Sequence, residues 1–226
     1  MTAVSIDSSN GPVSAILERP ADAWLTYVLA HGAGAGMRHK FMESITTALA
    51  GRGVATLRYQ FPYMEAGLKR PDSPAVAEAT VGAAVRRAAE LAPGLPVIAG
   101  GKSFGGRMTS GAAARGLLPG VTGLAFLGFP LHPPGRPGTQ RAEHLDHVHI
   151  PMLFLQGTRD TFARLDLLEP VCRRLTPRAT LHLVEGGDHS FAVPKNSGRS
   201  ASEVLDELAD TLVRWARALV SGTVPA

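Results

Sequence analysis

The chain has 226 residues, of which 45% are hydrophobic and 19% charged, as is usual for a globular protein with a substantial core. Its formal net charge of +4 is modest and its basic residues are scattered, which argues against a nucleic-acid-binding patch. The single cysteine excludes an intrachain disulfide. The first twenty residues have no apolar leader, and no run approaches the roughly 18 apolar residues of a membrane span. We therefore expect a cytoplasmic protein with no membrane or nucleic-acid partner.

Strand and helix signals alternate along the chain. Two β-type runs flank Asn10-Gly11, a hairpin signal, and are expected to form an antiparallel ribbon at the edge of the sheet. The expected strands are residues 3–7, 13–18, 24–30, 54–57, 96–100, 121–129, 152–156 and 179–184. The expected helices are residues 38–50, 75–92, 104–115, 164–175 and 201–220, the last with a capping box formed by Ser200 and Glu203. With no repeat and no linker, residues 1–226 are predicted to form one doubly wound α/β domain with a mostly parallel sheet.

The first expected parallel strand ends in a loop with almost no side chains, His31-Gly32-Ala33-Gly34-Ala35-Gly36. It looks like a dinucleotide-binding fingerprint, but G-x-G-x-x-G requires glycine where Met37 stands. A nucleotide cofactor is therefore not expected at this loop.

The segment 58–74 follows the next strand and carries large apolar side chains in a turn-rich stretch. Phe61, Tyr63 and Met64 have no helical or strand periodicity that would bury them in the core. Because the segment leaves the carboxyl end of a strand, we expect these side chains, with His31, to line a substrate pocket. The alternative is that Phe61 and Tyr63 only pack against neighbouring loops.

The next strand breaks at Gly101-Lys102-Ser103-Phe104-Gly105, which fits G-x-S-x-G. A serine on a tight strand-to-helix turn projects its hydroxyl above the sheet, and the glycines leave room for that turn. The same residues resemble the end of a phosphate-binding P-loop, but Pro96 stands where that motif requires its first glycine. Ser103 is therefore a candidate nucleophile.

Two further strand ends supply an acid and a base. The order Ser103, Asp160, His189 is that of a nucleophile, acid and base in a serine hydrolase of the α/β type. An imidazole must take the proton of a serine hydroxyl, and a carboxylate fixes the tautomer of that imidazole. Asp160 is preferred over the adjacent Asp188, which would point away from the ring. Asp160 could instead cap the following helix, and His189 could be an ordinary surface-loop residue.

An oxyanion hole needs two backbone N–H groups. Phe104, which follows the candidate nucleophile, is expected to supply one. The glycine-rich loop is expected to supply the other, from Ala33 or alternatively from Gly34. His31 is expected to be a structural hydrogen-bonding residue rather than a catalyst.

The other reactive side chains give weaker signals. His144, His147 and His149, with Asp146, could suggest a metal cluster, but their spacing fits no good ligand template. Cys172 lies on an expected helix and is interpreted as an inert core thiol. We expect neither a metal nor an organic cofactor.

The motifs together resemble the small, lidless α/β-hydrolases of the dienelactone-hydrolase-like kind. They are His-Gly-Ala-Gly-Ala from residue 31, Gly-Gly-Lys-Ser-Phe-Gly-Gly-Arg-Met from 100, Leu-Phe-Leu-Gln-Gly-Thr-Arg-Asp from 153 and Gly-Asp-His-Ser-Phe from 187. Residues 59–63 and 141–145 also resemble a group that includes a subunit of a eukaryotic histone-acetyltransferase complex. The resemblance implies an α/β-hydrolase fold without a cap domain and a Ser103, Asp160, His189 triad. Dienelactone hydrolases themselves use a cysteine nucleophile, which this chain replaces with serine.

The residues and the resemblance together predict a serine hydrolase that acts on small-molecule carboxylic esters or thioesters of small acyl groups through an acyl-enzyme. The alternative is a binding or interaction module that keeps the fold with a vestigial triad. The sequence leaves the oligomeric state open.

Overall fold

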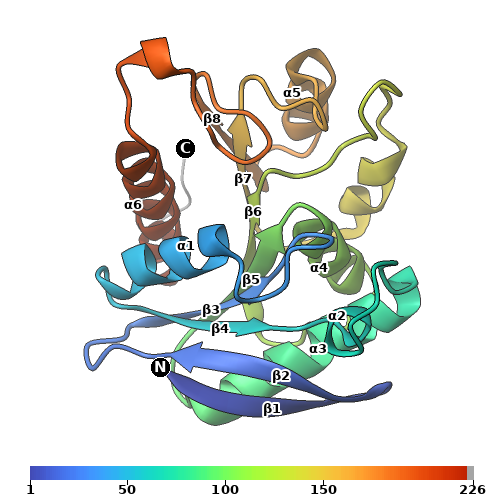
Figure 1. Cartoon of the computed structure of the whole chain (residues 1–226), viewed down its shortest axis with the longest axis vertical. Coiled ribbons are helices and arrows are strands. Elements are labelled where there is room, and N and C mark those ends of the chain that lie inside the picture. Colours follow the sequence, from blue (N-terminus) through green and yellow to red (C-terminus); the bar gives the residue numbers. More distant parts are fainter. Residues whose placement is uncertain (223–226) are drawn as a thin grey trace.

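The computed structural model describes residues 1–222 as one eight-stranded sheet with helices on both faces (Figure 1). The strands are β1 (Thr2–Ser8), β2 (Gly11–Glu18), β3 (Leu25–Ala30), β4 (Val54–Tyr59), β5 (Val97–Lys102), β6 (Val121–Leu127), β7 (Met152–Gly157) and β8 (Ala179–Val184). Their order in the sheet is β1-β2-β4-β3-β5-β6-β7-β8. All neighbours from β4 to β8 are parallel, whereas β1 and β2 pair antiparallel at one edge. The predicted fold class and edge ribbon are confirmed.

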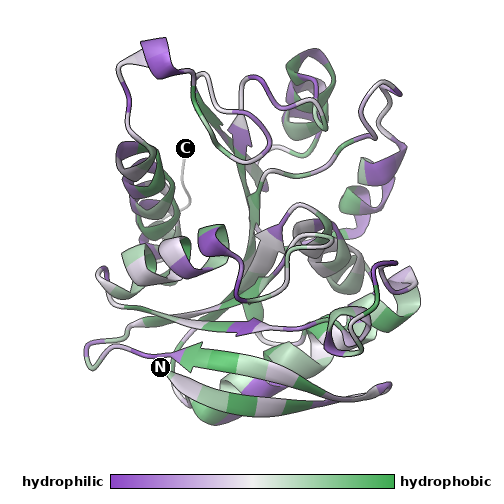
Figure 2. Cartoon of the chain, in the orientation of Figure 1, coloured by the Kyte–Doolittle hydropathy of each residue, from purple (hydrophilic) through white to green (hydrophobic). Residues whose placement is uncertain are grey.

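The helices divide between the two faces of the sheet. They are α1 (Lys40–Ala50), α2 (Pro62–Glu65), α3 (Pro74–Leu91), α4 (Phe104–Ala114), α5 (Leu165–Arg174) and α6 (Ala201–Val220), with short 3₁₀ helices η1 (Gln140–His147) and η2 (Lys195–Ser197). One buried apolar cluster joins α1 and α6 to the sheet, and a second joins α3, α4 and α5 to its other face. In Figure 2, hydrophobic residues run through the strands and through parts of the helices that cover them.

The elements follow from the sequence pattern. β3, β4 and β7 are buried at every position, as expected for strands covered on both faces. Helix α6 buries one stripe, which includes Val204, Leu208 and Leu212. Its predicted capping box is present: the Ser200 hydroxyl accepts the Glu203 N–H at 3.2 Å, and the Glu203 carboxylate accepts the Ser200 N–H at 2.6 Å.

Two segments expected to be loops contain short helices. Residues 58–74 include α2, which begins at Pro62, where the fixed φ of proline suits the first helical position. The connection from β6 to β7 includes η1. Neither segment builds a separate cap over the sheet within residues 1–222. Among these residues, no helix is long and apolar enough to cross a lipid bilayer.

The chain reverses its direction of winding at β3. From β3 it passes through α1 to β4 on one side, and it later returns to β5 on the other side. In a parallel sheet such a switch point leaves a crevice at the carboxyl ends of the two strands. The loop beginning at His31 follows β3 and Ser103 follows β5, so both lie at this crevice. Asp160 and His189 follow β7 and β8.

Glycine allows the first turn of α4 to approach the end of β3. A Cβ atom on Gly105 would lie 2.5 Å from the Ala30 carbonyl oxygen and 2.6 Å from that of His31. A Cβ atom on Gly101 would lie 2.4 Å from the same Ala30 oxygen. Because these neighbours are backbone atoms, they cannot move aside without displacing the strand.

We therefore expect Gly105→Ala to lower the free energy of unfolding by about 1–3 kcal/mol, the usual cost of overpacking. Gly51→Ala is the matched control, because its new Cβ would have no neighbour closer than 3.6 Å and its φ is −63°. Urea unfolding of both variants measures the difference. Equal stabilities of the two variants would show that the close approach is not a constraint.

Candidate active site

Ser103 occupies a strained turn between β5 and α4. Its φ of 50° and ψ of −115° lie in a region that non-glycine residues rarely adopt. The turn is held by the Ser103 N–H, which donates to the Leu127 carbonyl at 3.2 Å, and by the Arg107 N–H, which donates to the Ser103 carbonyl at 3.1 Å. This is the strand–turn–helix context that gives the G-x-S-x-G pattern its chemical meaning.

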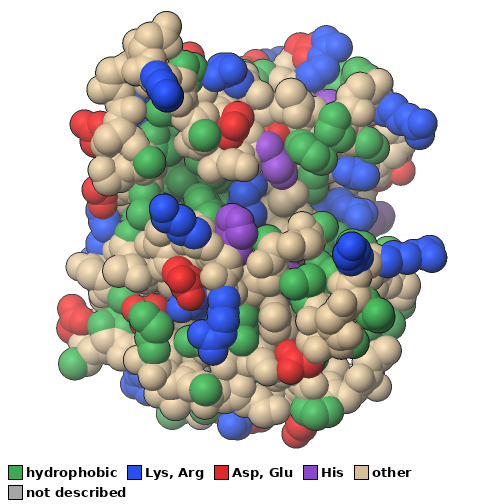
Figure 3. All heavy atoms as spheres, viewed as in Figure 1, with side chains coloured by type: hydrophobic (Ala, Val, Ile, Leu, Met, Phe, Trp, Pro, Cys, Tyr) green, Lys and Arg blue, Asp and Glu red, His purple; other side chains and the backbone are tan. Residues whose placement is uncertain are grey.

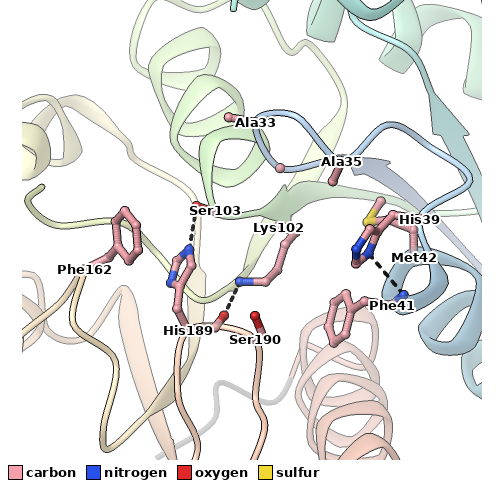
Figure 4. Close-up of a pocket in the computed structure, with 11 residues that line it drawn as sticks. Ala33, Ala35, His39, Phe41, Met42, Lys102, Ser103, Phe162, His189 and Ser190 are labelled. Carbon is pink, nitrogen blue, oxygen red and sulfur yellow. Dashed lines mark hydrogen bonds between the residues drawn. The ribbon is translucent and has the colours of Figure 1, made fainter. Parts of the chain in front are cut away.

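Two hydrogen bonds join Ser103, His189 and Asp160 in a chain. His189 Nε2 lies 2.8 Å from Ser103 Oγ, and Nδ1 lies 2.7 Å from Asp160 Oδ2 (Figure 4 shows the first of these contacts). The Asp160 side chain is fully buried, whereas that of His189 is 20% exposed. With the Nδ1 proton donated to the carboxylate, Nε2 is free to accept the serine proton. The arrangement can therefore activate a hydroxyl as a nucleophile.

Both carboxylate oxygens of Asp160 have partners. Oδ2 also accepts the Gln156 side-chain amide at 2.5 Å, and Oδ1 accepts the Phe162 N–H at 2.7 Å. One oxygen of Asp160 thus closes the turn that precedes α5, and the other faces the imidazole. Asp160 does not cap α5, because the N-cap residue of that helix is Arg164. Asp188 instead accepts the N–H groups of Ser190 and Ala192 at 2.7 and 2.9 Å, within its own turn.

Two side chains that the sequence analysis did not single out hold His189. The Phe162 ring stacks on the imidazole, with a centroid separation of 4.2 Å and an interplanar angle of 29°. Lys102 Nζ donates to the His189 carbonyl and lies 5.4 Å from the centroid of the Phe191 ring (Figure 4). Burial lowers the pKa of Lys102 to about 8, although the charges of the nearby aspartates oppose this shift. The sequence feature that could have indicated Lys102 as a site residue is its position directly before Ser103.

The structure distinguishes between Ala33 and Gly34 as the N–H donor that the glycine-rich loop was expected to supply. The Gly34 N–H donates to the Tyr63 hydroxyl at 3.1 Å, so it is already used. The N–H groups of Ala33 and Phe104 donate no hydrogen bond within residues 1–222, and Ala33 lines the cavity beside Ser103. Of the expected oxyanion donors, Ala33 and Phe104 are therefore available and Gly34 is not.

His31 is a structural residue, as the sequence analysis expected, but it does not line the pocket. It is completely buried, with Nδ1 2.8 Å from the Gly32 carbonyl oxygen and Nε2 accepting the Phe61 N–H at 3.2 Å. Burial lowers the pKa of His31 to about 4, so the ring is neutral near pH 7. Its two hydrogen bonds fix the glycine-rich loop to the segment after β4.

The expectation that Phe61, Tyr63 and Met64 line the substrate pocket also needs correction. Phe61 and Tyr63 are buried, and the Phe61 ring packs edge-on against Phe104 at 5.3 Å between centroids. Met64 lies beside a different cavity, near Gln60. Tyr63 on the short helix α2 and Phe61 just before it face inward, beneath the glycine-rich loop rather than above Ser103, whereas Met64 is half-buried. The positions of Phe61 and Tyr63 agree with the alternative expectation, in which they only pack against neighbouring loops.

The cavity beside Ser103 has a volume of about 290 Å³. One side is formed by His39, Phe41 and Met42 at the start of α1, and the opposite side by Phe162 and His189 (Figure 4). Histidine side chains are visible near the middle of the face shown in Figure 3. Ligand pockets typically begin at about 300 Å³, so this cavity suits a small group.

The histidines considered as metal ligands do not form a site. Within residues 1–222, no three or more His, Cys, Asp and Glu side chains are arranged to hold a metal ion. His144 Nε2 instead lies 2.7 Å from the Ser110 hydroxyl. Cys172 is a free, buried thiol, and its burial raises its pKa to about 12.

Solved structures share this architecture. One is a serine hydrolase without a lid from Xanthomonas campestris, at 19% identity and a TM-score of 0.70, covering 100% of this chain and 95% of that one. A dienelactone hydrolase from Anabaena variabilis has 20% identity and a TM-score of 0.76, with 96% of each chain covered. An esterase domain from Rhodothermus marinus has 19% identity and a TM-score of 0.71, with 96% of this chain and 97% of that one covered. At these identities the likeness shows the fold.

A family model described as an alpha/beta hydrolase domain matches residues 24–217. The match begins just before β3 and ends within α6, so it includes every strand that carries a candidate site residue. The chain therefore belongs to the α/β-hydrolase family.

Proposed function

We propose that this protein is a serine hydrolase that cleaves carboxylic esters or thioesters of small acyl groups. The observation that carries the proposal is the continuous hydrogen-bonded chain from Ser103 through His189 to Asp160, at a strained turn beside a cavity. Structural neighbours named as a serine hydrolase and an esterase support the same class of reaction. The resemblance to the group with the histone-acetyltransferase-complex subunit stays a prediction.

The reaction has two halves. Ser103 Oγ attacks the acyl carbonyl carbon while His189 Nε2 takes the hydroxyl proton, and the same proton then passes to the departing alkoxide or thiolate. In the second half His189 Nε2 takes a proton from water as the water oxygen attacks the acyl carbon, and this proton passes to Ser103 Oγ when the bond between the acyl carbon and Oγ breaks. Asp160 stabilises the imidazolium formed in each half and keeps the ring in the required orientation.

The backbone supplies the oxyanion hole. The N–H groups of Ala33 and Phe104 stabilise the negative charge that develops on the carbonyl oxygen. The Tyr63 hydroxyl contributes indirectly, because its bond to the Gly34 N–H holds the loop that presents Ala33. His31 secures the beginning of the same loop.

The size of the cavity supports the proposed substrate class. About 290 Å³ accommodates a small acyl group, and the fold has no separate cap over it within residues 1–222. The serine nucleophile argues against the specific substrate of dienelactone hydrolases, which use cysteine. The alternative is a non-catalytic binding module, for which the parent protein should neither react with the probe nor hydrolyse esters in the first experiment below.

We expect Ser103→Ala to abolish labelling by a fluorophosphonate probe and to lower ester hydrolysis by about 10⁴-fold or more, because the nucleophile is lost. Gel-based labelling and hydrolysis of p-nitrophenyl acetate measure the two effects. Ser190→Ala is a matched control, since Ser190 lines the same cavity but lies outside the hydrogen-bonded chain. A parent protein that neither labels nor hydrolyses esters would favour the non-catalytic alternative.

Asp160→Asn should lower kcat by about 10²- to 10⁴-fold, because an amide supports the wrong imidazole tautomer. Asp188→Asn should have a much smaller effect, since its carboxylate accepts only backbone N–H groups of its own turn. Steady-state kinetics with p-nitrophenyl acetate compare the two. The reverse ranking would move the acid to Asp188.

Lys102 is proposed as a positioning residue, acting through the His189 carbonyl. Because the pKa of Lys102 is lowered to about 8, activity of the parent should decline as the ammonium loses its charge above that pH. Lys102→Met should remove this alkaline dependence and lower kcat by about tenfold, whereas Lys102→Arg should restore part of the activity. An unchanged pH profile in Lys102→Met would exclude the role.

Unfolding provides a readout for Lys102 that does not depend on turnover. The ordinary pKa of lysine is 10.5, so between about pH 8 and 10.5 the unfolded chain binds more protons than the folded one. The stability of the parent relative to Lys102→Met should therefore rise with pH over this window. A stability difference between the parent and Lys102→Met that stays constant across this pH window would contradict the lowered pKa of Lys102.

A further inference from the structure

An apolar groove adjoins the cavity beside Ser103 and lies between α1, α6 and the turn that follows His189. Its volume is about 480 Å³. Its large apolar lining residues are Phe41 on α1, Phe191 in the turn, and Val204, Leu205 and Leu208 on α6. In Figure 3 a hollow lined by hydrophobic side chains is visible to the left of the central histidines, at the place between α1 and α6 in Figure 1. Pockets of this volume and lining typically bind the apolar parts of small ligands.

The groove and the cavity are continuous. His39, Phe41 and Ser190 line both of them. In Figure 4 the Phe41 and Ser190 side chains lie at the end of the cavity away from Ala33, whose N–H is an expected oxyanion donor. A carbonyl oxygen that points to Ala33 therefore directs the rest of an ester toward the end of the cavity where the groove begins.

The turn after His189 holds an aromatic wall in place at this junction. The Phe41 and Phe191 rings are stacked, with a centroid separation of 5.8 Å and an interplanar angle of 18°. Phe191 has a φ of 63°, in the left-handed region that bulky residues rarely adopt. Its N–H donates to the Asp188 carbonyl at 2.9 Å, and the Asp188 N–H donates to the Ala192 carbonyl at 3.0 Å. The strained turn thus keeps the Phe191 ring against Phe41, where groove and cavity meet.

The charges around the groove favour an uncharged ligand. Within the part of the chain that the structure describes, its lining has no carboxylate, and its basic side chains, His39 and Lys40, are exposed. The buried ammonium of Lys102 already donates to the His189 carbonyl. An alkyl chain is therefore the ligand that gains most from this lining, since each methylene removed from water favours binding.

The position of His189 determines which part of an ester faces the groove. When Ser103 is acylated, His189 Nε2 donates a proton to the leaving oxygen, so that oxygen must lie within hydrogen-bonding distance of the ring. Residues 190–192, which line the groove, follow His189 directly. The chain attached to the leaving oxygen thus begins beside this turn. The acyl group is left to the smaller cavity of about 290 Å³.

We propose that the groove binds the alkyl chain of the alcohol part of the ester, so that preferred substrates join a small acyl group to a longer apolar alcohol. This inference rests on the proposed serine hydrolase activity and names its substrate class. A second copy of the chain would cover the same apolar side chains, but it would give no dependence on the chain length of the alcohol.

Two isomeric esters test the assignment. Hexyl acetate and ethyl hexanoate have the same formula, but the first carries its long chain on the alcohol and the second on the acyl group. The parent should hydrolyse hexyl acetate with a kcat/KM about tenfold higher than that for ethyl hexanoate, and higher than that for ethyl acetate. Titration of the released acid at constant pH measures all three rates.

Variants of the groove locate the preference. Leu205→Ala should lower the ratio of kcat/KM for hexyl acetate to that for ethyl acetate by about threefold to fivefold, because apolar contact is lost. Ser44→Trp, which fills the groove from α1, should also lower this ratio. Leu219→Ala is the matched control and should leave the ratio unchanged. Leu219 is another partly buried side chain of α6 that packs against the same apolar cluster as Leu205, but it does not line the groove.

Thermal unfolding establishes that each variant is folded. Equal kcat/KM values for the two isomers, or a higher value for ethyl hexanoate, would overturn the proposal even though the hydrolysis itself would still support the proposed function. Equal values together with a dimer in analytical ultracentrifugation would assign the groove to a second copy. A ratio lowered as much by Leu219→Ala as by Leu205→Ala would also overturn the proposal. A parent that hydrolyses none of the three esters would contradict the proposed function, and the assignment of the groove with it.

Discussion

The close approach of α4 to the end of β3 is the constraint on which the site depends. Glycines at 101 and 105 let the helix begin against the carbonyl groups of Ala30 and His31, and the turn between them places Ser103 at a positive φ. The same contact brings the Phe104 N–H close to the glycine-rich loop. This packing requirement thus sets the direction of the hydroxyl, whereas the contacts of Tyr63 and His31 hold the loop that carries Ala33.

The remaining groups are arranged around this turn by buried polar contacts. Asp160 is fixed from both sides, by Gln156 and by the Phe162 backbone, before it reaches His189. His189 is itself held by the Phe162 ring and by Lys102. A lysine with a lowered pKa so close to the serine is a costly choice for stability alone, which is why we assign it a positioning role.

The sequence predicted the features that follow from local chemistry. The alternation of strands and helices, the Asn10-Gly11 hairpin and the Ser200 cap each depend on neighbouring residues, and the structure confirms them. The prediction that Phe61 and Tyr63 line the substrate pocket was wrong. Their position depends on how α2 packs beneath a loop that is distant in the sequence, and the hydrophobic periodicity of the segment carries no information about that packing. Lys102 was missed for a similar reason, since its partner His189 lies 87 residues further along the chain. The apolar groove likewise appears only once α1, α6 and the turn after His189 are packed together.

The central claim is that Ser103 carries the acyl group during turnover. Rapid acid quenching of the parent protein with p-nitrophenyl acetate, followed by digestion and mass spectrometry, tests it directly. The account predicts an acetyl group on the peptide that contains Ser103, formed within the first turnover. Hydrolysis that proceeds with the acetyl group on another residue, or with no acylated peptide at all when deacylation is slowed, would contradict it.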